Sequence, residues 1–521
     1  MHTSWSSAQV RAAEEPLLAA RVPLMARAAF ALAGVVRREL VGRRGAVRGA
    51  RVVLLVGPGN NGGDALHAGA LLARSGAAVV AVVTAARVHP AGLAALRTAA
   101  GRAVALGGVH GDLPPVGLDE AAELAAAGDV VLDGLLGIGS SGGGVRGEAG
   151  RLVEVLADRL ARPRAPEPDD RRPSRVPPAA PPCVVAVDVP SGVGVDDGTT
   201  GAAVLPADVT VTFGVPKPAL LLPPAAWAAG RVELVDIGLE PQGTPAVVRL
   251  EDDDAAALWP VPGPEAHKYT RGVLGVVAGT RRYPGAAVLT STAAVLAGVG
   301  MVRYVGDVGP EVVAARPEVV VGEGRVQAWV LGPGVDPDDA GQRRRVDAAL
   351  VGVRDRGEPA AVDAGALRRL PDRVGPHVVL TPHAGELALL LTARGEPVER
   401  AQVEAEPLRW ARAAHDLTGA TVLLKGGVTV VVGAHGAVFA QAEAPSWLAT
   451  AGSGDVLAGV LGALLAGRAD DVHAEPSLAA ALAATAALVH GRAGERANPG
   501  GPVAALDVAR ALPATVADLL R

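Results

Sequence analysis

The segment Gly452-Ser-Gly-Asp455 near the C-terminus combines small residues with a carboxylate, a pattern suited to phosphoryl chemistry. Apolar residues recur at helical spacing after Asp455, so we expect the loop to turn into a helix at about Gly454 and Asp455. Free N–H groups in a first helical turn attract phosphate, and a carboxylate beside them can accept a proton from a substrate hydroxyl. The alternative interpretation is that Asp455 is only a helix N-terminal residue after a turn.

A second glycine-rich loop, Gly57-Pro-Gly-Asn-Asn-Gly-Gly-Asp64, lies between an expected strand and an expected helix. Its glycines fit the pattern G-x-G-x-x-G, which is typical of a dinucleotide-binding turn. The next expected strand ends without an acidic residue to hold a ribose, which disfavours a standard dehydrogenase. Asn60, Asn61 and Asp64 add oxygens and amides that could bind a nucleotide and a cation together. A tight turn that uses Asn and Gly for positive φ is the competing interpretation.

Carboxylates also stand at the ends of two further expected strands. Asp133 and Asp188 each follow an apolar run and precede a polar or glycine-rich loop. Ligands of parallel α/β sheets bind beyond the carboxyl ends of the strands, so these residues and the 57–64 loop predict one shared site. Any single strand-end aspartate is more often a turn or cap residue.

The second half of the chain repeats this arrangement with different side chains. Asp363 ends an apolar run, while His383 and Glu386 lie on a loop that enters a helix. His383 taken alone is better explained as a core or capping histidine. Lys425 lies between an apolar run and two glycines, and buried lysines are rare without an anionic partner. The pattern G-x-x-x-x-G-K-[ST] does not occur, so the sequence excludes a P-loop.

Strand and helix patterns alternate along the chain, which predicts two α/β domains with largely parallel sheets. The helical pattern over 7–40 is expected to break near Pro16 and Pro23. Residues 161–182 are dense in Pro, Arg and Asp and indicate a surface insertion, and the acidic run 251–254 suggests the domain boundary. The apolar runs that predict strands are 51–56, 77–83, 130–133, 184–188, 209–213, 231–235, 273–277, 326–331, 360–363 and 421–425.

Length and composition limit the class of protein. A chain of 521 residues is too long for one ordinary core, and its formal net charge of −5 argues against nucleic-acid or anionic-membrane binding. Cys183 is the only cysteine, so an intramolecular disulfide is excluded. Arginine greatly outnumbers lysine, which singles out Lys217, Lys268 and Lys425. No apolar run reaches transmembrane length and no signal-peptide pattern opens the chain, so we expect a cytoplasmic enzyme.

The order and combination of these motifs resemble the bifunctional NAD(P)H-hydrate repair enzymes over almost the whole chain. The resemblance implies a Rossmann-like three-layer epimerase domain over residues 1–245, with the insertion at 161–182. It implies a ribokinase-like α/β domain over 251–521 that acts as an ADP-dependent dehydratase. The segments that carry the resemblance are 57–64, 133–139, 187–191, 267–272, 283–286, 331–334, 381–386, 425–429 and 452–455.

In that family the first domain interconverts the R and S forms of NADHX and NADPHX, nicotinamide cofactors hydrated at C6. By position, Asn61, Asp133 and Ser191 would hold a potassium ion (K⁺), and their amide, carboxylate and hydroxyl oxygens suit a hard cation. Asp188 would handle the proton at the reacting ring. The residues implied to contact the hydrate are Asn60, Asn61, Gly62, Gly63, Asp64, Gly137, Ile138, Gly139, Ser140, Ser141, Gly142, Gly143 and Asp188.

The second domain is implied to dehydrate the S form at the expense of ADP, giving NAD(P)H, AMP and phosphate with the assistance of Mg²⁺. Asp455 would deprotonate the C6 hydroxyl. The small-molecule partners would be NADHX, NADPHX and ADP, with no nucleic acid and no membrane, and we expect a homo-oligomer. The implied contacts of the S-hydrate are Ala286, Gly334, His383 and Asp455. The implied contacts of the nucleotide are Lys425, Gly426, Gly427, Val428, Thr429 and Gly454.

Two alternative functions stay open. A small-molecule kinase of the ribokinase-like superfamily shares the anion loop and its aspartate but does not need a fused first domain. The first domain could instead be a non-catalytic nucleotide-binding module, although such a scaffold has no need for three potassium ligands together with Asp188. Three departures from the family pattern fall in this domain, one of which is the insertion at 161–182. Ala65 replaces a usual glycine, and residues 24–29 read Leu-Met-Ala-Arg-Ala-Ala where relatives tend to carry Met-Glu-Asn-Ala-Gly.

Overall fold

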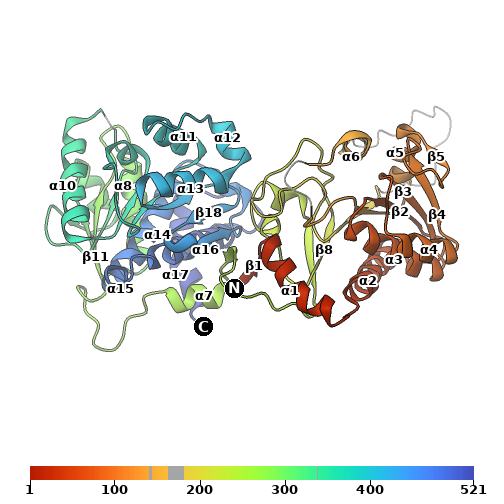
Figure 1. The fold of residues 1–521 in the computed structure, drawn as a ribbon. Coiled ribbons are helices and arrows are strands. Elements are labelled where there is room, and N and C mark those ends of the chain that lie inside the picture. Colours follow the sequence, from red (N-terminus) through yellow and green to blue (C-terminus); the bar gives the residue numbers. More distant parts are fainter. Residues whose placement is uncertain (140–143, 162–180, 337) are drawn as a thin grey trace, which may run out of the picture. The chain divides into compact units, whose positions relative to one another are not determined.

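The computed structural model describes residues 1–139, 144–161, 181–336 and 338–521 (Figure 1). The predicted contacts Ser140, Ser141, Gly142 and Gly143, and most of the predicted insertion, lie outside the described residues. The chain divides into two compact units, residues 3–246 and residues 1–2 with 247–521. Each unit is built around one β-sheet, which confirms the predicted fold class of two α/β domains.

The first unit contains six described α-helices and eight described strands. Its helices are α1 (Ser7–Ala19), α2 (Leu24–Arg44), α3 (Asn60–Arg74), α4 (Pro90–Thr98), α5 (Leu118–Ala126) and α6 (Gly147–Ala161). Its strands are β2 (Arg51–Val56), β3 (Ala78–Val83), β4 (Arg102–Leu106), β5 (Pro115–Val116), β6 (Val130–Gly134), β7 (Cys183–Val187), β8 (Val209–Phe213) and β9 (Arg231–Val235).

All eight strands of this sheet are parallel, in the order β5-β4-β3-β2-β6-β7-β8-β9. Successive residues of β2 alternate between two cores. Val52, Leu54 and Val56 pack with α2, α3 and α4, whereas Val53 and Leu55 pack with α5 and α6. The predicted three-layer arrangement is therefore confirmed. The chain leaves β2 toward β3 on one side and later adds β6 on the other, so the topological switch point falls between β2 and β6.

The N-terminal helical region differs from the prediction at Pro16. Helix α1 continues through Pro16 to Ala19, and the break falls at residues 20–23, directly before α2. Pro23 disfavours helical backbone in the residue before it, which explains the position of the break. Pro16 cannot donate a hydrogen bond to the carbonyl oxygen of Ala12, but the helix continues past it to Ala19.

The second unit has an eleven-stranded mixed sheet in the order β1-β10-β19-β18-β17-β16-β15-β14-β11-β12-β13. The strands are β1 (His2–Ser4), β10 (Val247–Arg249), β11 (Val273–Val277), β12 (Met301–Tyr304), β13 (Val320–Val321), β14 (Ala328–Leu331), β15 (Ala360–Val362), β16 (Val378–Leu380), β17 (Thr421–Leu424), β18 (Thr429–Val432) and β19 (Val438–Gln441). The helices are α7 (Asp252–Leu258), α8 (Pro284–Leu296), α9 (Gly309–Ala315), α10 (Ala340–Arg356), α11 (Ala384–Ala393), α12 (Arg400–Ala405), α13 (Pro407–Thr418), α14 (Ser453–Gly467), α15 (Ala469–Ala474), α16 (Leu478–Ala497) and α17 (Ala505–Leu519).

Strands β11 and β14 to β17 of this sheet are parallel, so their carboxyl ends share one edge. Helices α8, α14, α16 and α17 pack in a continuous apolar core, which includes Leu274, Val330 and Leu423 from the strands. Figure 1 shows α13 and α16 on opposite sides of β18. The hairpin of β17 and β18 makes the sheet mixed, and its turn carries Lys425.

A helix that spans a membrane must be both long and apolar. Across the described parts of the chain, no single helix meets both requirements. The pair α1 and α2 meets them only when taken together, and the two helices bend by 113° at their junction. Buried core helices can meet the same requirements, and α2 contributes Leu32, Val36 and Leu40 to the core.

Candidate active sites at the carboxyl ends of the two sheets

The loops after β2 and β6 lie against each other at the switch point of the first sheet. A Cβ atom placed on Gly57 would lie 1.8 Å from the carbonyl oxygen of Leu135, so only glycine allows this approach. Asn61, in the first turn of α3, spans the same gap. Its Nδ2 donates to the carbonyl oxygens of Leu136 at 3.0 Å and Val187 at 2.5 Å. Asn61 therefore joins the start of α3 to the ends of β6 and β7.

Asp133 and Ser191 form a buried pair beside this junction. Ser191 donates its Oγ to Asp133 Oδ1 at 2.6 Å and its backbone N–H to Oδ2 at 2.8 Å. Burial raises the pKa of Asp133, although the hydrogen bonds from Ser191 oppose the shift. Leu136 connects the pair to Asn61, because its N–H donates to Ser191 Oγ at 2.9 Å. The three predicted potassium ligands thus lie together, and their oxygen types fit a hard cation.

Asp188 directly follows β7, and Lys217 lies in the loop after β8. Their side chains form a second buried pair. Lys217 Nζ donates to Asp188 Oδ1, to Thr212 Oγ1 at 3.1 Å and to the carbonyl oxygen of Phe213 at 2.8 Å. The Lys217 side chain is 1% exposed. Asp188 has a φ of +70°, which is unfavourable for a non-glycine residue and is often found where a site requires it. Lys217 was not predicted as a site residue, although the scarcity of lysine had singled it out.

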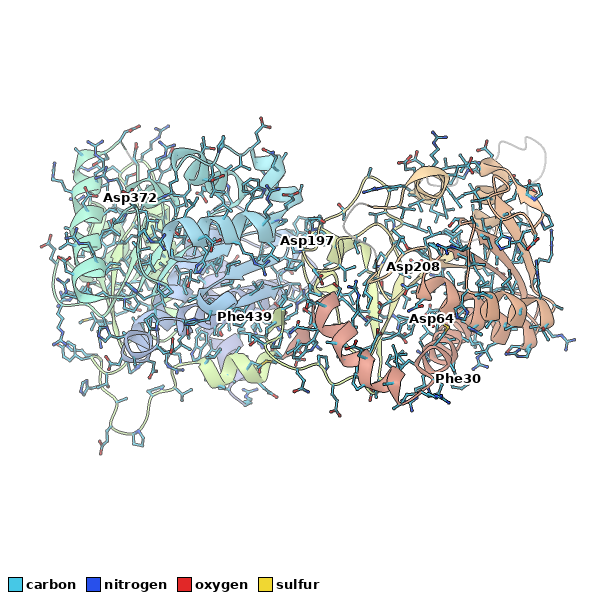
Figure 2. The ribbon with its side chains drawn as sticks, in the orientation of Figure 1. Phe30, Asp64, Asp197, Asp208, Asp372 and Phe439 are labelled. Atoms are coloured by element: carbon cyan, nitrogen blue, oxygen red, sulfur yellow. The ribbon has the colours of Figure 1, made fainter. Side chains whose placement is uncertain are left out.

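Asp64 lies on α3 with its carboxyl group buried (Figure 2). Its Oδ1 has no hydrogen-bond partner among the described residues. Burial and the negative charges of Asp188 and Glu14 raise the pKa of Asp64 well above its usual value. Glu14 on α1 was not predicted, and burial raises its pKa as well. This end of the sheet therefore holds carboxyl groups in different environments, a condition for acid and base roles in one site.

Lys425 lies at the centre of the corresponding edge in the second unit. Its Nζ is 2.8 Å from Asp363 Oδ1 and 3.8 Å from Glu386 Oε2. Burial alone would lower the pKa of Lys425, but the charges of Asp363, Glu386 and Asp455 outweigh burial and raise it. A Cβ on Gly454 would lie 3.4 Å from Lys425 Nζ. The lysine and the glycine loop are thus neighbours, as expected for two parts of one nucleotide site.

Asp455 lies in the first turn of α14, which begins at Ser453 after Gly452 with a φ of +87°. The helix start is close to the predicted position. Burial raises the pKa of Asp455 to about 6, with Asp363 adding to the shift and Lys425 opposing it. Asp455 therefore follows a turn at the start of a helix, as the alternative interpretation predicted, and no side chain caps α14 in the described structure. A half-buried carboxylate with this pKa is suited to a general base near neutral pH.

His383 caps α11, as its sequence context alone had indicated. Its Nδ1 accepts from the N–H groups of Gly385 at 3.0 Å and Glu386 at 3.3 Å, while the carboxylate of Glu386 accepts from the N–H of His383. An isolated bridge pairs His383 with Lys425. His383 therefore reaches the same edge as Lys425 even though its ring nitrogen Nδ1 is engaged in capping.

The other predicted residues fall into two groups at this edge. Ala286, at the start of α8, lies beside Gly334, where a Cβ would be 2.5 Å from the Cβ of Ala286. Gly426, Gly427 and Val428 form the turn between β17 and β18, and Thr429 begins β18. Both groups follow strands whose carboxyl ends share the edge with Asp363.

His490 on α16 is a buried polar residue that sequence reasoning missed. Its Nε2 lies 3.3 Å from the Oγ of Ser453, the first residue of α14. Burial lowers the pKa of His490 to about 4, so the ring is neutral at pH 7. It lies among small residues in an Ala-rich helix, and the sequence contained no signal that connected it to the glycine loop.

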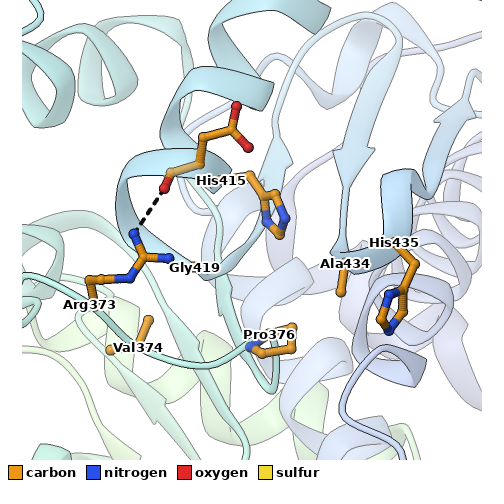
Figure 3. Close-up of a pocket in the computed structure, with 8 residues that line it drawn as sticks. Arg373, Val374, Pro376, His415, Gly419, Ala434 and His435 are labelled. Atoms are coloured by element: carbon orange, nitrogen blue, oxygen red, sulfur yellow. Dashed lines mark hydrogen bonds between the residues drawn. The ribbon is translucent and has the colours of Figure 1, made fainter.

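A cavity of about 420 Å³ lies elsewhere in the second unit (Figure 3). It is found at the amino ends of β16 and β17, the edge opposite Asp363 and Lys425. Arg373 spans part of it and donates to the backbone oxygen of Asp416 at 3.1 Å. No predicted site residue lines this cavity, whose lining residues are Arg373, Val374, Pro376, His415, Asp416, Gly419, Ala434 and His435.

Each of the two α/β domains gathers acidic, lysine and glycine-loop residues at one edge of its sheet, an arrangement typical of an enzyme with a candidate ligand site in each domain. Residues 274–513 match the family described as NAD(P)H-hydrate dehydratase, and residues 22–219 match the YjeF-related protein N-terminus. The bifunctional NAD(P)H-hydrate repair enzyme of Mycobacterium tuberculosis is 44% identical over 480 residues, with 89% of each chain covered. That of Corynebacterium glutamicum is 34% identical over 548 residues, with 89% of this chain and 87% of the relative covered. The chain belongs to the family of bifunctional NAD(P)H-hydrate repair enzymes, as the sequence motifs predicted.

Solved structures resemble the second half of the chain. An ADP/ATP-dependent NAD(P)H-hydrate dehydratase from Bacillus subtilis is 26% identical with a TM-score of 0.45, covering 52% of this chain and 97% of its own. A ribokinase-like superfamily protein from Enterococcus faecalis is 21% identical with a TM-score of 0.46, covering 54% of this chain and 99% of its own.

Proposed function

We propose that this chain repairs hydrated nicotinamide cofactors in two steps. Residues 1–245 interconvert the R and S forms of NADHX and NADPHX, and residues 251–521 dehydrate the S form at the expense of ADP. The products are NAD(P)H, AMP and phosphate. The observation that carries this proposal is the position of Asp455, a half-buried carboxylate with a pKa of about 6 beside Lys425 and the glycine loop.

In the first domain, Asp188 is proposed to move the proton as water is released from C6 and added back on the opposite face. Lys217 holds the Asp188 carboxylate through a bond to Oδ1, which leaves the other oxygen to face the ring. Asn61, Asp133 and Ser191 would hold K⁺, which would supply positive charge near the bound hydrate. The remaining predicted contacts of the hydrate are Asn60–Asp64 and Gly137–Gly139, while the predicted contacts at 140–143 lie outside the described residues.

In the second domain, Asp455 is proposed to take the proton of the C6 hydroxyl while its oxygen attacks the terminal phosphorus of ADP. AMP leaves with the electron pair of the broken P–O bond. Phosphate then departs from C6, and loss of a proton from C5 forms the C5–C6 double bond of NAD(P)H. Lys425 and the N–H groups at Gly454 neutralise charge on the phosphoryl oxygens.

Mg²⁺ is proposed to bind together with the nucleotide phosphates. The carboxylates of Asp363 and Glu386, next to Lys425, supply the hard oxygen ligands that such an ion prefers. Bound there, the ion would neutralise charge on the transferred phosphoryl group. Ala286, Gly334 and His383 are proposed to contact the S-hydrate, and residues 425–429 to contact ADP.

A cytoplasmic location and a homo-oligomeric state belong to the same proposal. The single cysteine, Cys183, is buried and free, which suits a reducing compartment. Light scattering of the purified chain would measure the oligomeric state directly, and a monomeric mass would contradict that part.

The test is to mix purified protein with enzymatically prepared NADHX, ADP and Mg²⁺ and follow the return of NADH absorbance. Absorbance should return only with nucleotide, and Asp455→Asn should abolish it. Recovery of the R form beyond its spontaneous epimerisation should require Asp188. If nucleotide is consumed with another alcohol while NADHX is untouched, the chain is a small-molecule kinase.

The same assay tests whether the first domain is only a scaffold. Asp188→Asn should lose recovery of the R form while the S form is still dehydrated at the parent rate. Equal recovery of the R form by parent and variant would assign the first domain a non-catalytic role.

A further inference from the structure

The loop 278–283 joins β11 to α8 and lies against the segment that follows β14. The N–H of Gly279 donates to the carbonyl oxygen of Pro333 at 2.7 Å. A Cβ on Gly334 would lie 3.4 Å from the carbonyl oxygen of Tyr283 and 2.5 Å from the Cβ of Ala286. The loop is therefore held against the two residues proposed to contact the hydrate.

This loop carries two adjacent arginines, Arg281 and Arg282, and both are exposed. The guanidinium of Arg282 lies over the ring of Tyr283, 5.2 Å from its centroid, which limits the directions it can take. Among the described residues neither arginine forms an ion pair. Many arginines of this unit do, for example Arg345 with Asp307 and Arg369 with Asp347.

Two acidic residues close in sequence to Gly334 do not pair with the two arginines. Asp336 Oδ1 accepts from the backbone N–H of Asp338 at 2.9 Å. Asp339 caps α10, where its Oδ1 accepts from the N–H of Gln342 at 2.9 Å. Both carboxylates thus accept hydrogen bonds within their own turn, and neither forms an ion pair with Arg281 or Arg282 among the described residues. The two positive charges lie on the loop that contacts Gly334 and Ala286.

We propose that Arg281 and Arg282 bind the phosphate groups of the hydrate and so determine how the dehydratase recognises a dinucleotide rather than a nicotinamide ring alone. This inference rests on the proposed function. NADHX carries a diphosphate, and NADPHX carries an additional 2′-phosphate. A guanidinium binds phosphate through paired N–H donors, and two of them side by side match either group. Asp455 and Lys425 act on the ring and on ADP, so the arginines would contribute to hydrate affinity without entering the chemical step.

The experiment compares the variant Arg281→Ala/Arg282→Ala with the parent protein, using the S forms of NADHX and NADPHX at saturating ADP. We expect the KM for hydrate to rise about tenfold or more with little change in kcat, because the lost contacts are remote from the reacting carbon. A rise with both hydrates identifies the diphosphate, and a rise with NADPHX alone identifies the 2′-phosphate. Unchanged KM values for both hydrates, or a rise in the KM for ADP instead, would overturn the proposal.

Two controls separate this outcome from trivial causes. Arg325 is also exposed and without an ion pair in the described structure, but it precedes β14 at the opposite edge of the sheet, so Arg325→Ala should keep the parent KM. The variant Arg281→Lys/Arg282→Lys keeps the charges and should recover part of the affinity. A parent protein that cannot restore NADH would refute the proposed function, whereas an active parent with an equally active double variant would refute only the role of the arginines.

Discussion

Lys425 Nζ lies 2.8 Å from Asp363 Oδ1, and this contact connects the ends of β17 and β15 across the strand between them, β16. The Asp363 side chain is 4% exposed, so its charge depends on the lysine for compensation. The same ammonium group is close to Gly454 and within electrostatic reach of Asp455. The ammonium group of Lys425 therefore stabilises the buried Asp363 at the sheet edge and also belongs to the proposed phosphoryl site.

Replacement of Lys425 by Met should destabilise the second unit by about 3 to 5 kcal/mol, because it leaves a buried carboxylate without a partner. Hydrogen exchange of peptides from β15 and β17 in the full chain would measure the loss locally. Lys268→Met is the matched control, since Lys268 is exposed and should leave exchange unchanged. If Lys425→Met exchanged these amide hydrogens as slowly as the parent does, the structural role of the pair would be contradicted.

The activity of the dehydratase should depend on the ionisation of Asp455. A general base acts only when ionised, so kcat/KM should fall about tenfold per pH unit below pH 6 and be level above it. Asp455→Asn should remove the activity. Lys425 lowers the pKa of Asp455, so any activity left in Lys425→Met should show its acid limb at higher pH. A profile of the parent that stays level down to pH 4.5 would rule out Asp455 as the base.

The raised pKa of Asp455 also predicts a pH-dependent effect on stability. The folded state binds this proton more tightly than the unfolded state, whose pKa is near the usual value of 3.8. The free-energy cost of ionising Asp455 in the folded state therefore applies fully above pH 6. It vanishes below the pKa that Asp455 has in the unfolded state. Asp455→Asn should raise the stability of the second unit by about 1 to 3 kcal/mol at pH 7.5, with a much smaller gain at pH 4. Thermal unfolding of parent and variant at both values of pH would measure the difference, and an equal gain at both would contradict the linkage.

Two glycines of the 57–64 loop should differ sharply in their tolerance of a methyl group. A Cβ on Gly57 would lie 1.8 Å from the carbonyl oxygen of Leu135, whereas a Cβ on Gly59 meets nothing within 4 Å. Gly57→Ala must therefore separate the loops after β2 and β6, which should abolish recovery of the R hydrate. Gly59→Ala should fold as the parent does. Epimerase assays and thermal unfolding of both variants would measure this contrast, and equal effects would refute the close approach.

The residues that gather at the two sheet edges could largely be predicted because strand ends are visible in the sequence. Apolar runs that close on Asp133, Asp188 and Asp363 marked the correct edges of the sheets, since parallel strands place their carboxyl ends together. The glycine loops were equally visible because close backbone approach requires glycine. The sequence could not show which acidic side chain pairs with which lysine, because those contacts depend on tertiary packing.

The sequence did not predict the residues that reach the two sheet edges from distant parts of the chain. Lys217 follows Asp188 by a long stretch of chain and meets it only because β7 and β8 are neighbours in the sheet. Glu14 comes from α1, which has no sequence link to the glycine loop. His490 reaches Ser453 from a helix whose composition suggests only core packing. The predicted helix break at Pro16 was also wrong, because Pro16 removes one backbone donor from α1 and the helix nevertheless continues to Ala19.

The buried pair of Asp188 and Lys217 should behave as a unit when it is mutated. Lys217→Met leaves the Asp188 carboxylate buried, and Asp188→Asn leaves a lysine that is 1% exposed without its anion. Each single change should cost about 3 to 5 kcal/mol, and the double variant should cost clearly less than the sum. Hydrogen exchange of peptides from β8 would measure all three variants in the full chain. Additive costs would show that the two side chains are stabilised independently. A stable double variant that cannot recover the R hydrate would separate the chemical role of the pair from its role in folding.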